Sequence, residues 1–364
     1  MHNLANGGWL YMKFKEIIIR GTPYERGFAY GQMGRDEIAV SIGSYQKLFE
    51  CTKGIKWEDA RKVSEHFLAL TREFQPYYVE EMQGIADGAG VDLLDIAALN
   101  ARTEIMYAQY EGKGAGECTT LSLMAPATEG GRVIAAQNWD YSTILRDSLV
   151  IVHVYSEDKP NFVMVTEAGM IGGIGMNDQG IAVLLNALTT TSPCQGLPLR
   201  TRMRAMLEAE TLSDAYVKGG TVPVTVANLI ATHKDGVAIE FEMDSKTVEP
   251  LIPEDGVLLH TNCYLGPKMY LNNDVNHRGS SYIRLQRVKA LVKECHGKIT
   301  IEDVQRILCD HSGYPYSICT HENMKDAFVD RDATNFSVIM DLSEGCMYLA
   351  PGNPCESEFE KISI

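Results

Sequence analysis

The spacing of hydrophobic positions along the chain changes near residue 118. Between residues 23 and 115, apolar residues recur every three or four positions, which is the spacing of amphipathic helices. The glycines of "GIADGAG", at residues 84–90, are typical of a helix C-terminus. We therefore predict that residues 1–117 form a mainly helical N-terminal segment.

From residue 118 onward the apolar runs are short, and many alternate with polar residues. Runs such as "CTTLSLMAP", "SLVIVHVYS" and "GIAVLLNAL" predict strands, and "TEGG" and "NDQG" predict the turns between them. Helical spacing returns at residues 199–219, 281–295 and 300–311. This pattern predicts an α+β body over residues 118–364, with mostly antiparallel strands packed against helices.

Charge and hydropathy exclude some classes of partner. The chain has 33 Lys and Arg against 48 Asp and Glu, a formal net charge of −15, which argues against a nucleic-acid partner. No apolar run reaches the roughly 18 residues that a membrane helix requires. The first residues have neither the basic leader nor the apolar region of a secretory signal, so a cytoplasmic protein is expected.

The spacing of cysteine and histidine along the chain argues against a metal site. The nine cysteines are odd in number and contain no CxxC pair, so neither a disulfide framework nor a zinc site is indicated. The nine histidines contain no HxxxH or HxH spacing. We therefore expect no metal.

Cys118 differs from the other eight cysteines because the flexible run "EGKGAGE" directly precedes it. The strand that begins at Cys118 and the run "RVIAAQNWDY" should form an antiparallel hairpin around the tight turn "TEGG". The numbers of facing residues should then sum to roughly 257 to 259. This places Cys118 opposite residues 139–141, which include Asp140. A carboxylate raises the pKa of a nearby thiol, so a nucleophilic cysteine here needs a base.

Two sources of that base are open. Cleavage of the Glu117–Cys118 bond would give Cys118 a free α-amino group, whose usual pKa of about 7.7 to 8.0 suits a general base at neutral pH. The Asp140 carboxylate could then hold the amine in place. The alternative is a papain-like enzyme with a histidine partner, although no histidine here has a recognisable cysteine-protease signature.

Several motifs in order resemble one known family. "GECTT", "AQNWD", "TEAGMIGGIGMNDQGIAVLLNAL", "HTN" and "YPYSIC" are similar to motifs of the acyl-coenzyme A:6-aminopenicillanate acyltransferase family, the C45 group of autoproteolytic N-terminal nucleophile (Ntn) enzymes. The resemblance extends from "GTPYERGFAYGQ" to "FSVIMD". It implies a four-layer αββα Ntn fold and self-cleavage between Glu117 and Cys118. The α chain (1–117) and the β chain (118–364) would then remain associated.

The resemblance also implies roles for individual residues. Cys118 corresponds to the nucleophile and Asp140 to the carboxylate that orients its amine. Asn262 of "HTN" corresponds to the asparagine of the oxyanion hole. The more distant choloylglycine hydrolases suggest Asn186 as a second polar group near the oxyanion.

Three positions near these motifs bear on the substrate. Choloylglycine hydrolases have arginine where this chain has Gln137, which disfavours a bile-salt amidase. Asp330 replaces a serine found in the penicillin-forming enzymes, which disfavours acyl transfer to a penicillin nucleus. Arg331 is kept, either for recognition of a carboxylate or phosphate on the substrate or for a structural ion pair.

The expected function is that of an Ntn cysteine enzyme. It would hydrolyse a small N-acyl amide, or transfer the acyl group to an amine, through an acyl-enzyme on Cys118. The expected partner is a small acyl amide or thioester, with acyl-CoA as one allowed donor and no cofactor. The alternative, from another class, is a non-catalytic small-molecule-binding protein with a degenerate Ntn fold.

Overall fold

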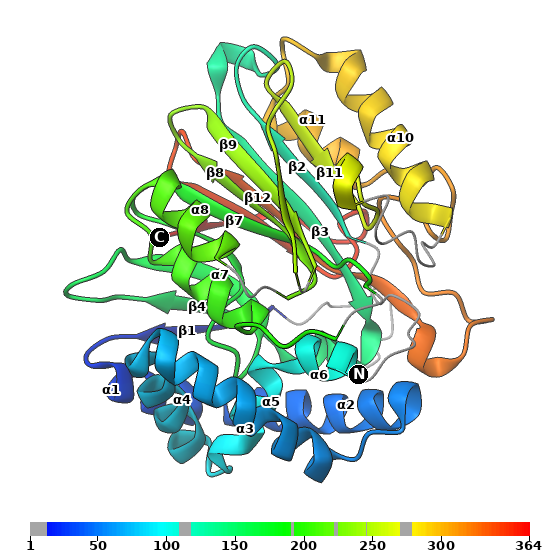
Figure 1. The fold of residues 1–364 in the computed structure, drawn as a ribbon. Coiled ribbons are helices and arrows are strands. Elements are labelled where there is room, and N and C mark those ends of the chain that lie inside the picture. Colours follow the sequence, from blue (N-terminus) through cyan, green and yellow to red (C-terminus); the bar gives the residue numbers. More distant parts are fainter. Residues whose placement is uncertain (1–12, 109–117, 191–192, 222–224, 245, 270–278) are drawn as a thin grey trace, which may run out of the picture.

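The protein is built from four layers, α, β, β and α. The computed structural model describes residues 13–108, 118–190, 193–221, 225–244, 246–269 and 279–364. In these residues the strands form two sheets, which pack face to face through β2 and β3 on one side and β7 on the other. Helices cover the outer face of each sheet, and a further group of helices lies at one end of the molecule (Figure 1). The α+β class and the four-layer Ntn fold are therefore confirmed.

The first sheet has eight strands within the described residues, and all neighbours are antiparallel except β1 and β4. Strands β4 to β7 are fully buried, which explains why their sequences are apolar without alternation. In sheet order the strands are β1 (Lys15–Ile19), β4 (Leu149–Val154), β5 (Phe162–Glu167), β6 (Ile174–Asn177), β7 (Ile181–Asn186), β8 (Ala227–His233), β9 (Val237–Met243) and β10 (Val248–Leu251).

The second sheet carries Cys118 at the start of one of its central strands. Its order is β11 (Val257–His260), β2 (Thr119–Leu123), β3 (Ile134–Ser142), β12 (Asp332–Asp341), β13 (Cys346–Pro351) and β14 (Glu360–Ser363). In the β2–β3 hairpin Thr119 faces Asn138, as the expected register requires. The predicted tight turn is wrong, however. Residues 124–133 form a longer connection that includes the 3-10 turn η1 (Glu129–Gly131), and a second 3-10 segment, η2 (Thr143–Ser148), follows β3.

Four helices of the described residues cover the outer faces of the sheets. The helices α7 (Leu199–Leu207) and α8 (Leu212–Gly220) pack on the first sheet, whereas α10 (Gly279–Cys295) and α11 (Ile301–Leu308) pack on the second. The helical spacing over residues 199–219 therefore belongs to two helices instead of one. The division occurs because the Thr211 side chain accepts a hydrogen bond from the Asp214 amide and begins α8.

The segment before Cys118 is mainly helical, but it also contributes the strand β1 to the first sheet. Helices α1 and α4 pack with their backbones close together, because both have glycines where they cross. A Cβ atom on Gly27 would lie 2.0 Å from the Glu81 carbonyl oxygen, and one on Gly84 would lie 2.3 Å from that of Tyr24. Within residues 13–108 the helices are α1 (Pro23–Met33), α2 (Arg35–Lys53), α3 (Trp57–Phe74), α4 (Pro76–Ala89), α5 (Leu93–Asn100) and α6 (Arg102–Ala108).

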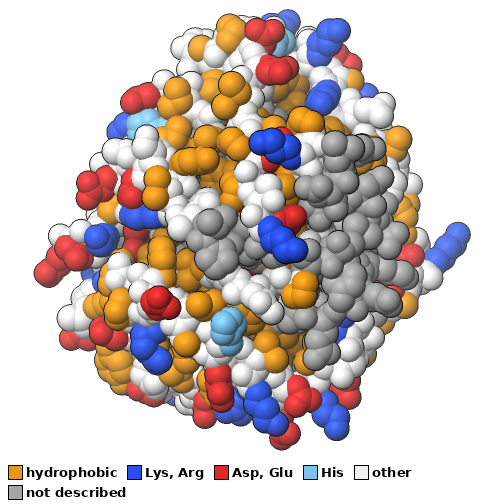
Figure 2. Space-filling model, in the orientation of Figure 1, with side chains coloured by type: hydrophobic (Ala, Val, Ile, Leu, Met, Phe, Trp, Pro, Cys, Tyr) orange, Lys and Arg blue, Asp and Glu red, His pale blue; other side chains and the backbone are white. Residues whose placement is uncertain are grey.

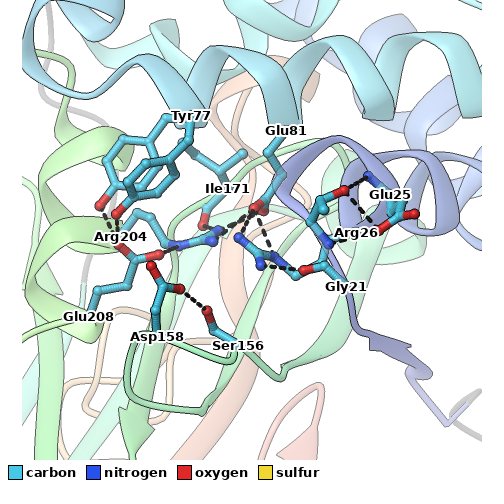
Figure 3. A network of polar contacts seen from close by, with 12 residues as sticks. Gly21, Glu25, Arg26, Tyr77, Glu81, Ser156, Asp158, Ile171, Arg204 and Glu208 are labelled. Atoms are coloured by element: carbon cyan, nitrogen blue, oxygen red, sulfur yellow. Dashed lines mark hydrogen bonds and ion pairs between the residues drawn. The ribbon is translucent and has the colours of Figure 1, made fainter.

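A buried network of charges joins these helices to α7 (Figure 3). Glu81 of α4 accepts two hydrogen bonds from Arg204 of α7, at 2.7 and 2.9 Å, and two from Arg26 of α1, at 3.2 and 3.3 Å. Arg204 also contacts Glu208, whose other oxygen accepts a hydrogen bond from the Tyr77 hydroxyl. Burial opposes ionisation of Glu81, but the two guanidinium groups lower its pKa below the usual value. The network therefore links parts of the chain on both sides of Cys118.

Charged side chains of both signs are interspersed with hydrophobic ones over the face shown in Figure 2. None of the helices in the described residues combines the length and the apolar character needed to cross a membrane.

Candidate active site

Cys118 lies just before β2, between the two sheets. Its side chain is 2% exposed, and its Sγ lies 3.8 Å from the backbone oxygen of Asp140 on β3. The thiol lines a small cavity of about 30 Å³. The other lining residues are mostly apolar and include Met106, Trp139, Leu185, Leu188 and Val226.

The surroundings of the thiol disfavour its ionised form in the uncut chain. Burial raises the pKa of the Cys118 thiol to about 12, and the negative charge of Asp140 acts in the same direction. The positive charge of Arg284 opposes this shift but does not outweigh it. Nucleophilic attack by Cys118 therefore requires a group that removes the thiol proton.

Asp140 is held in one orientation by two threonines from other parts of the chain. Its Oδ1 accepts a hydrogen bond from the Thr334 hydroxyl at 2.6 Å, and its Oδ2 accepts one from Thr320 at 3.0 Å. Thr334 faces Asp140 directly in the pairing of β12 with β3. The carboxylate is fully buried beside Cys118, so it could orient an ammonium group at that position.

Asn262 is joined to Cys118 through Arg284 of α10. The Arg284 guanidinium donates to the Cys118 carbonyl oxygen at 2.8 Å and to Asn262 Oδ1 at 3.1 Å. Because Oδ1 accepts this bond, the amide nitrogen of Asn262 is fixed on the opposite side, where it donates to the Ala187 carbonyl at 2.9 Å. The side-chain nitrogen of Asn262 carries two hydrogens. The Ala187 carbonyl accepts one of them, so the other remains for a substrate oxygen.

Asn186 contacts the backbone of Cys118. Its amide nitrogen donates to the Cys118 carbonyl oxygen at 3.3 Å. Its Oδ1 accepts hydrogen bonds from the Thr120 hydroxyl at 2.8 Å and from Asn228 at 3.2 Å. These bonds hold the residue at the end of β7 against the start of β2.

Gln137 joins the two sheets. Its side-chain amide donates to the Leu185 carbonyl at 2.5 Å and accepts from the Leu185 amide at 3.0 Å. This paired contact between β3 and β7 gives a structural use to the position at which the choloylglycine hydrolases have arginine.

One predicted residue lies apart from this group, and another lies outside the described residues. The Arg331 side chain donates to the carbonyls of Asp326 and Met324 and approaches Glu322 at 3.8 Å, next to the 3-10 segment η3 (Phe328–Asp330). Among the described residues that line the cavity at Cys118, Arg331 does not occur. Glu117, the other side of the predicted cleavage bond, lies outside the described residues.

The geometry does not favour a histidine as the base. Among the described residues, no histidine lines the cavity or hydrogen-bonds to Cys118. His260 lies opposite Thr120 in the second sheet, but its Nε2 contacts Glu242 at 2.9 Å and Glu240 at 3.6 Å. That imidazole is therefore engaged by two buried carboxylates.

Arg284, Thr320 and Thr334 were not identified from the sequence. For Arg284 a signal was present: it lies on the buried face of α10 together with Ser281, Leu285 and Val288. An arginine in the apolar stripe of a helix is rarely buried without a partner. The two threonines carried no comparable signal, because their contacts depend on pairing between distant segments.

The fold and this site define the class: the chain is an enzyme of the Ntn type, with a cysteine at the start of a central strand in an αββα sandwich. Residues 127–356 match the family described as acyl-coenzyme A:6-aminopenicillanic acid acyl-transferase. The chain belongs to this family.

The chain is also similar to relatives from other organisms and to a solved structure. The 40 kDa form of acyl-coenzyme A:6-aminopenicillanic-acid-acyltransferase from Emericella nidulans is 29% identical over 340 residues, covering 89% of both chains. The beta-alanyl-dopamine/carcinine hydrolase of Drosophila melanogaster is 24% identical and covers 94% of both chains. The structure of penicillin V acylase from Agrobacterium tumefaciens matches with a TM-score of 0.46 at 11% identity, covering 64% of this chain and 83% of that chain.

Proposed function

We propose that the chain cuts itself between Glu117 and Cys118 and then acts on a small N-acyl amide through an acyl-enzyme on Cys118. The observation that carries the proposal is the buried thiol of Cys118 beside a carboxylate, Asp140, which two threonines orient. The thiol pKa of about 12 means that the nucleophile needs a base. A free α-amine on the same residue would supply that base.

In the proposed reaction the α-amine takes the thiol proton and Sγ attacks the carbonyl carbon of the substrate. The developing oxyanion accepts a hydrogen bond from the Asn262 amide, which Arg284 holds in place. The amine then donates its proton to the leaving nitrogen, and the C–N bond breaks to give a thioester on Cys118. Water, or an amine acceptor, attacks this thioester and releases the thiol.

The residues around the cavity indicate which part of the substrate enters it. The apolar side chains of Met106, Trp139, Leu185 and Leu188 suit an apolar acyl group, and the small volume favours a short one. Arg102 also lines the cavity, but its guanidinium contacts Glu167 at 3.4 Å and lies over the ring of Tyr141. We therefore propose that the acyl side of the amide occupies this cavity. Hydrolysis is the main outcome. The names of the relatives include both an acyltransferase and an amide hydrolase, so both outcomes occur among proteins similar to this chain.

A paired panel of acyl donors tests the proposal. The cut protein is mixed with N-acyl amides and with acyl-CoA thioesters that carry the same acyl groups, with and without an amine acceptor, and is then quenched in acid. Mass spectrometry should find the fragment that begins at Cys118 increased by the mass of the acyl group. Cys118→Ser is the matched variant, and its fragment should carry no thioester. Turnover without any acyl adduct on Cys118 would contradict the proposal.

A further inference from the structure

A second group of chemically reactive side chains lies next to Thr320, which donates a hydrogen bond to Asp140. It consists of His311, Cys319, His321 and Cys355, whose ligand atoms all lie within 4.8 Å of one another. His311 follows α11, Cys319 and His321 precede η3, and Cys355 lies between β13 and β14. The expectation of no metal rested on the absence of CxxC, HxxxH and HxH spacing, whereas this group takes three ligands from residues 311–321, a single connection after α11, and the fourth from Cys355.

Three distances between these ligand atoms match those around a single tetrahedral ion, whereas the distance between the two histidine nitrogens is shorter. The two Sγ atoms are 3.5 Å apart, and the His321 Nε2 lies 3.5 Å from Cys319 Sγ and 3.4 Å from Cys355 Sγ. The two Nε2 atoms of His311 and His321 are 3.0 Å apart. Bonds of about 2.0–2.1 Å to nitrogen and about 2.3 Å to sulfur place tetrahedral ligands roughly 3.3–3.8 Å apart.

We propose that His311, Cys319, His321 and Cys355 bind one zinc ion. Two sulfur and two nitrogen ligands at these distances favour tetrahedral zinc over the oxygen-preferring cations. On binding, the two thiols release their protons to solvent, so two thiolates balance the charge of Zn²⁺ and both imidazoles stay neutral. A disulfide between the two cysteines would use only the sulfurs and leave the convergence of both imidazoles without a purpose.

The surroundings of the group have the other properties of a metal site. The Asn353 amide donates to Cys319 Sγ at 3.5 Å, and Glu356 lies 4.0 Å from Nδ1 of His321, the nitrogen that does not face the group. Such neighbours fix the orientation of metal ligands. Cys319 is buried, whereas His311 and Cys355 are exposed, so an ion can reach the group from solvent.

The position of the group indicates a structural purpose for the ion. Thr320 lies between two of the ligands, and its hydroxyl donates to Oδ2 of Asp140. The ion therefore fixes the segment that orients Asp140, while four protein ligands leave no open position for a substrate.

Zinc binding is tested on the full-length protein by measurement that is independent of activity. The protein is reduced with a phosphine, stripped with a chelator and titrated with Zn²⁺, and bound metal is measured by elemental mass spectrometry. We expect about one ion per chain and a higher unfolding midpoint with zinc than without it. Replacement by Co²⁺ should give the thiolate-to-cobalt absorption of a tetrahedral site.

Exposed ligands provide variants that should still fold. Cys355→Ser and His311→Ala should each weaken zinc binding on the order of 100-fold or more, because each removes one of four ligands. Cys51→Ser and His66→Ala replace exposed residues of α2 and α3 and serve as matched controls that should bind as tightly as wild type. Less than roughly a tenth of an ion per reduced chain, or equal binding by Cys355→Ser and wild type, overturns the proposal.

Discussion

At the scale of single residues, the amide of Asn262 is positioned before any substrate arrives. Arg284 fixes its Oδ1, so the amide nitrogen presents its hydrogens in a constant direction. Removing one preorganised donor to an oxyanion typically lowers turnover 100- to 1,000-fold. We predict that Asn262→Ala lowers kcat by this factor with little change in KM, measured on fully cut protein by steady-state kinetics. Asn161→Ala, in the β4–β5 turn, should leave kcat unchanged. If kcat is unaltered in Asn262→Ala, Asn262 is not part of the oxyanion hole.

The carboxylate of Asp140 should control the pH dependence of the reaction. A nearby negative charge favours the ammonium form of the Cys118 α-amine and so raises its pKa. Asp140→Asn keeps the shape and removes the charge, so the pKa of the amine falls and the rising limb of the kcat/KM profile moves to lower pH. Asp235→Asn, in the exposed β8–β9 turn, should leave the limb in place. A limb that does not move in Asp140→Asn means that the base is not this amine.

At the scale of elements, the crossing of α1 and α4 depends on glycines that leave no room for a side chain. Gly84→Ala places a methyl group 2.3 Å from the Tyr24 carbonyl oxygen, so the helices must separate. Overpacking of this kind typically costs about 1–3 kcal/mol, and we predict a loss of this size in the free energy of unfolding measured with denaturant. Gly43→Ala is the matched control, because this exposed glycine of α2 has no atom within 4 Å of the new Cβ. That change should stabilise by roughly 0.5–1 kcal/mol through helix propensity. Equal effects of the two substitutions contradict the packing argument.

Elements with strong local patterns were predictable from the sequence. The β2–β3 hairpin is the clearest case, because its register alone placed Cys118 near Asp140. The strands β1, β10 and β14 were missed because they are four or five residues long and lie at sheet edges, where few positions are buried.

Site residues that depend on tertiary contacts were less accessible. Thr320 and Thr334 reach Asp140 from segments far along the chain, and in the proposed zinc site Cys355 joins the nearby residues His311, Cys319 and His321 only in the folded protein. Local spacing cannot report such convergence. The role of Asn262, by contrast, rested on the resemblance and stays a prediction.

At the scale of the whole molecule, two connections should hold the fragments together after cleavage. The strand β1 pairs with β4, and Glu81 before the cut binds Arg204 after it. We predict that both fragments elute together in size-exclusion chromatography and separate only in denaturant. Fragments that separate in native buffer would contradict this arrangement.

The charge network should contribute strongly to this association. Glu81→Gln removes the carboxylate partner of Arg26 and leaves Arg204 with Glu208 alone, which should cost roughly 3–5 kcal/mol in the free energy of unfolding. Glu360→Gln removes the partner of Lys13 in an exposed ion pair and should leave the unfolding midpoint almost unchanged. A similar small effect of Glu81→Gln would show that the network is dispensable.

We propose above all that Cys118 becomes the N-terminal residue of the mature enzyme by its own attack on the preceding bond. The most direct measurement is the intact mass of the purified protein, together with that of Cys118→Ala prepared in parallel. We predict two fragments for wild type, the second of which begins at Cys118, and one uncut chain for Cys118→Ala. A wild-type protein that is active as a single chain, or a Cys118→Ala variant cut at the same bond, would contradict it.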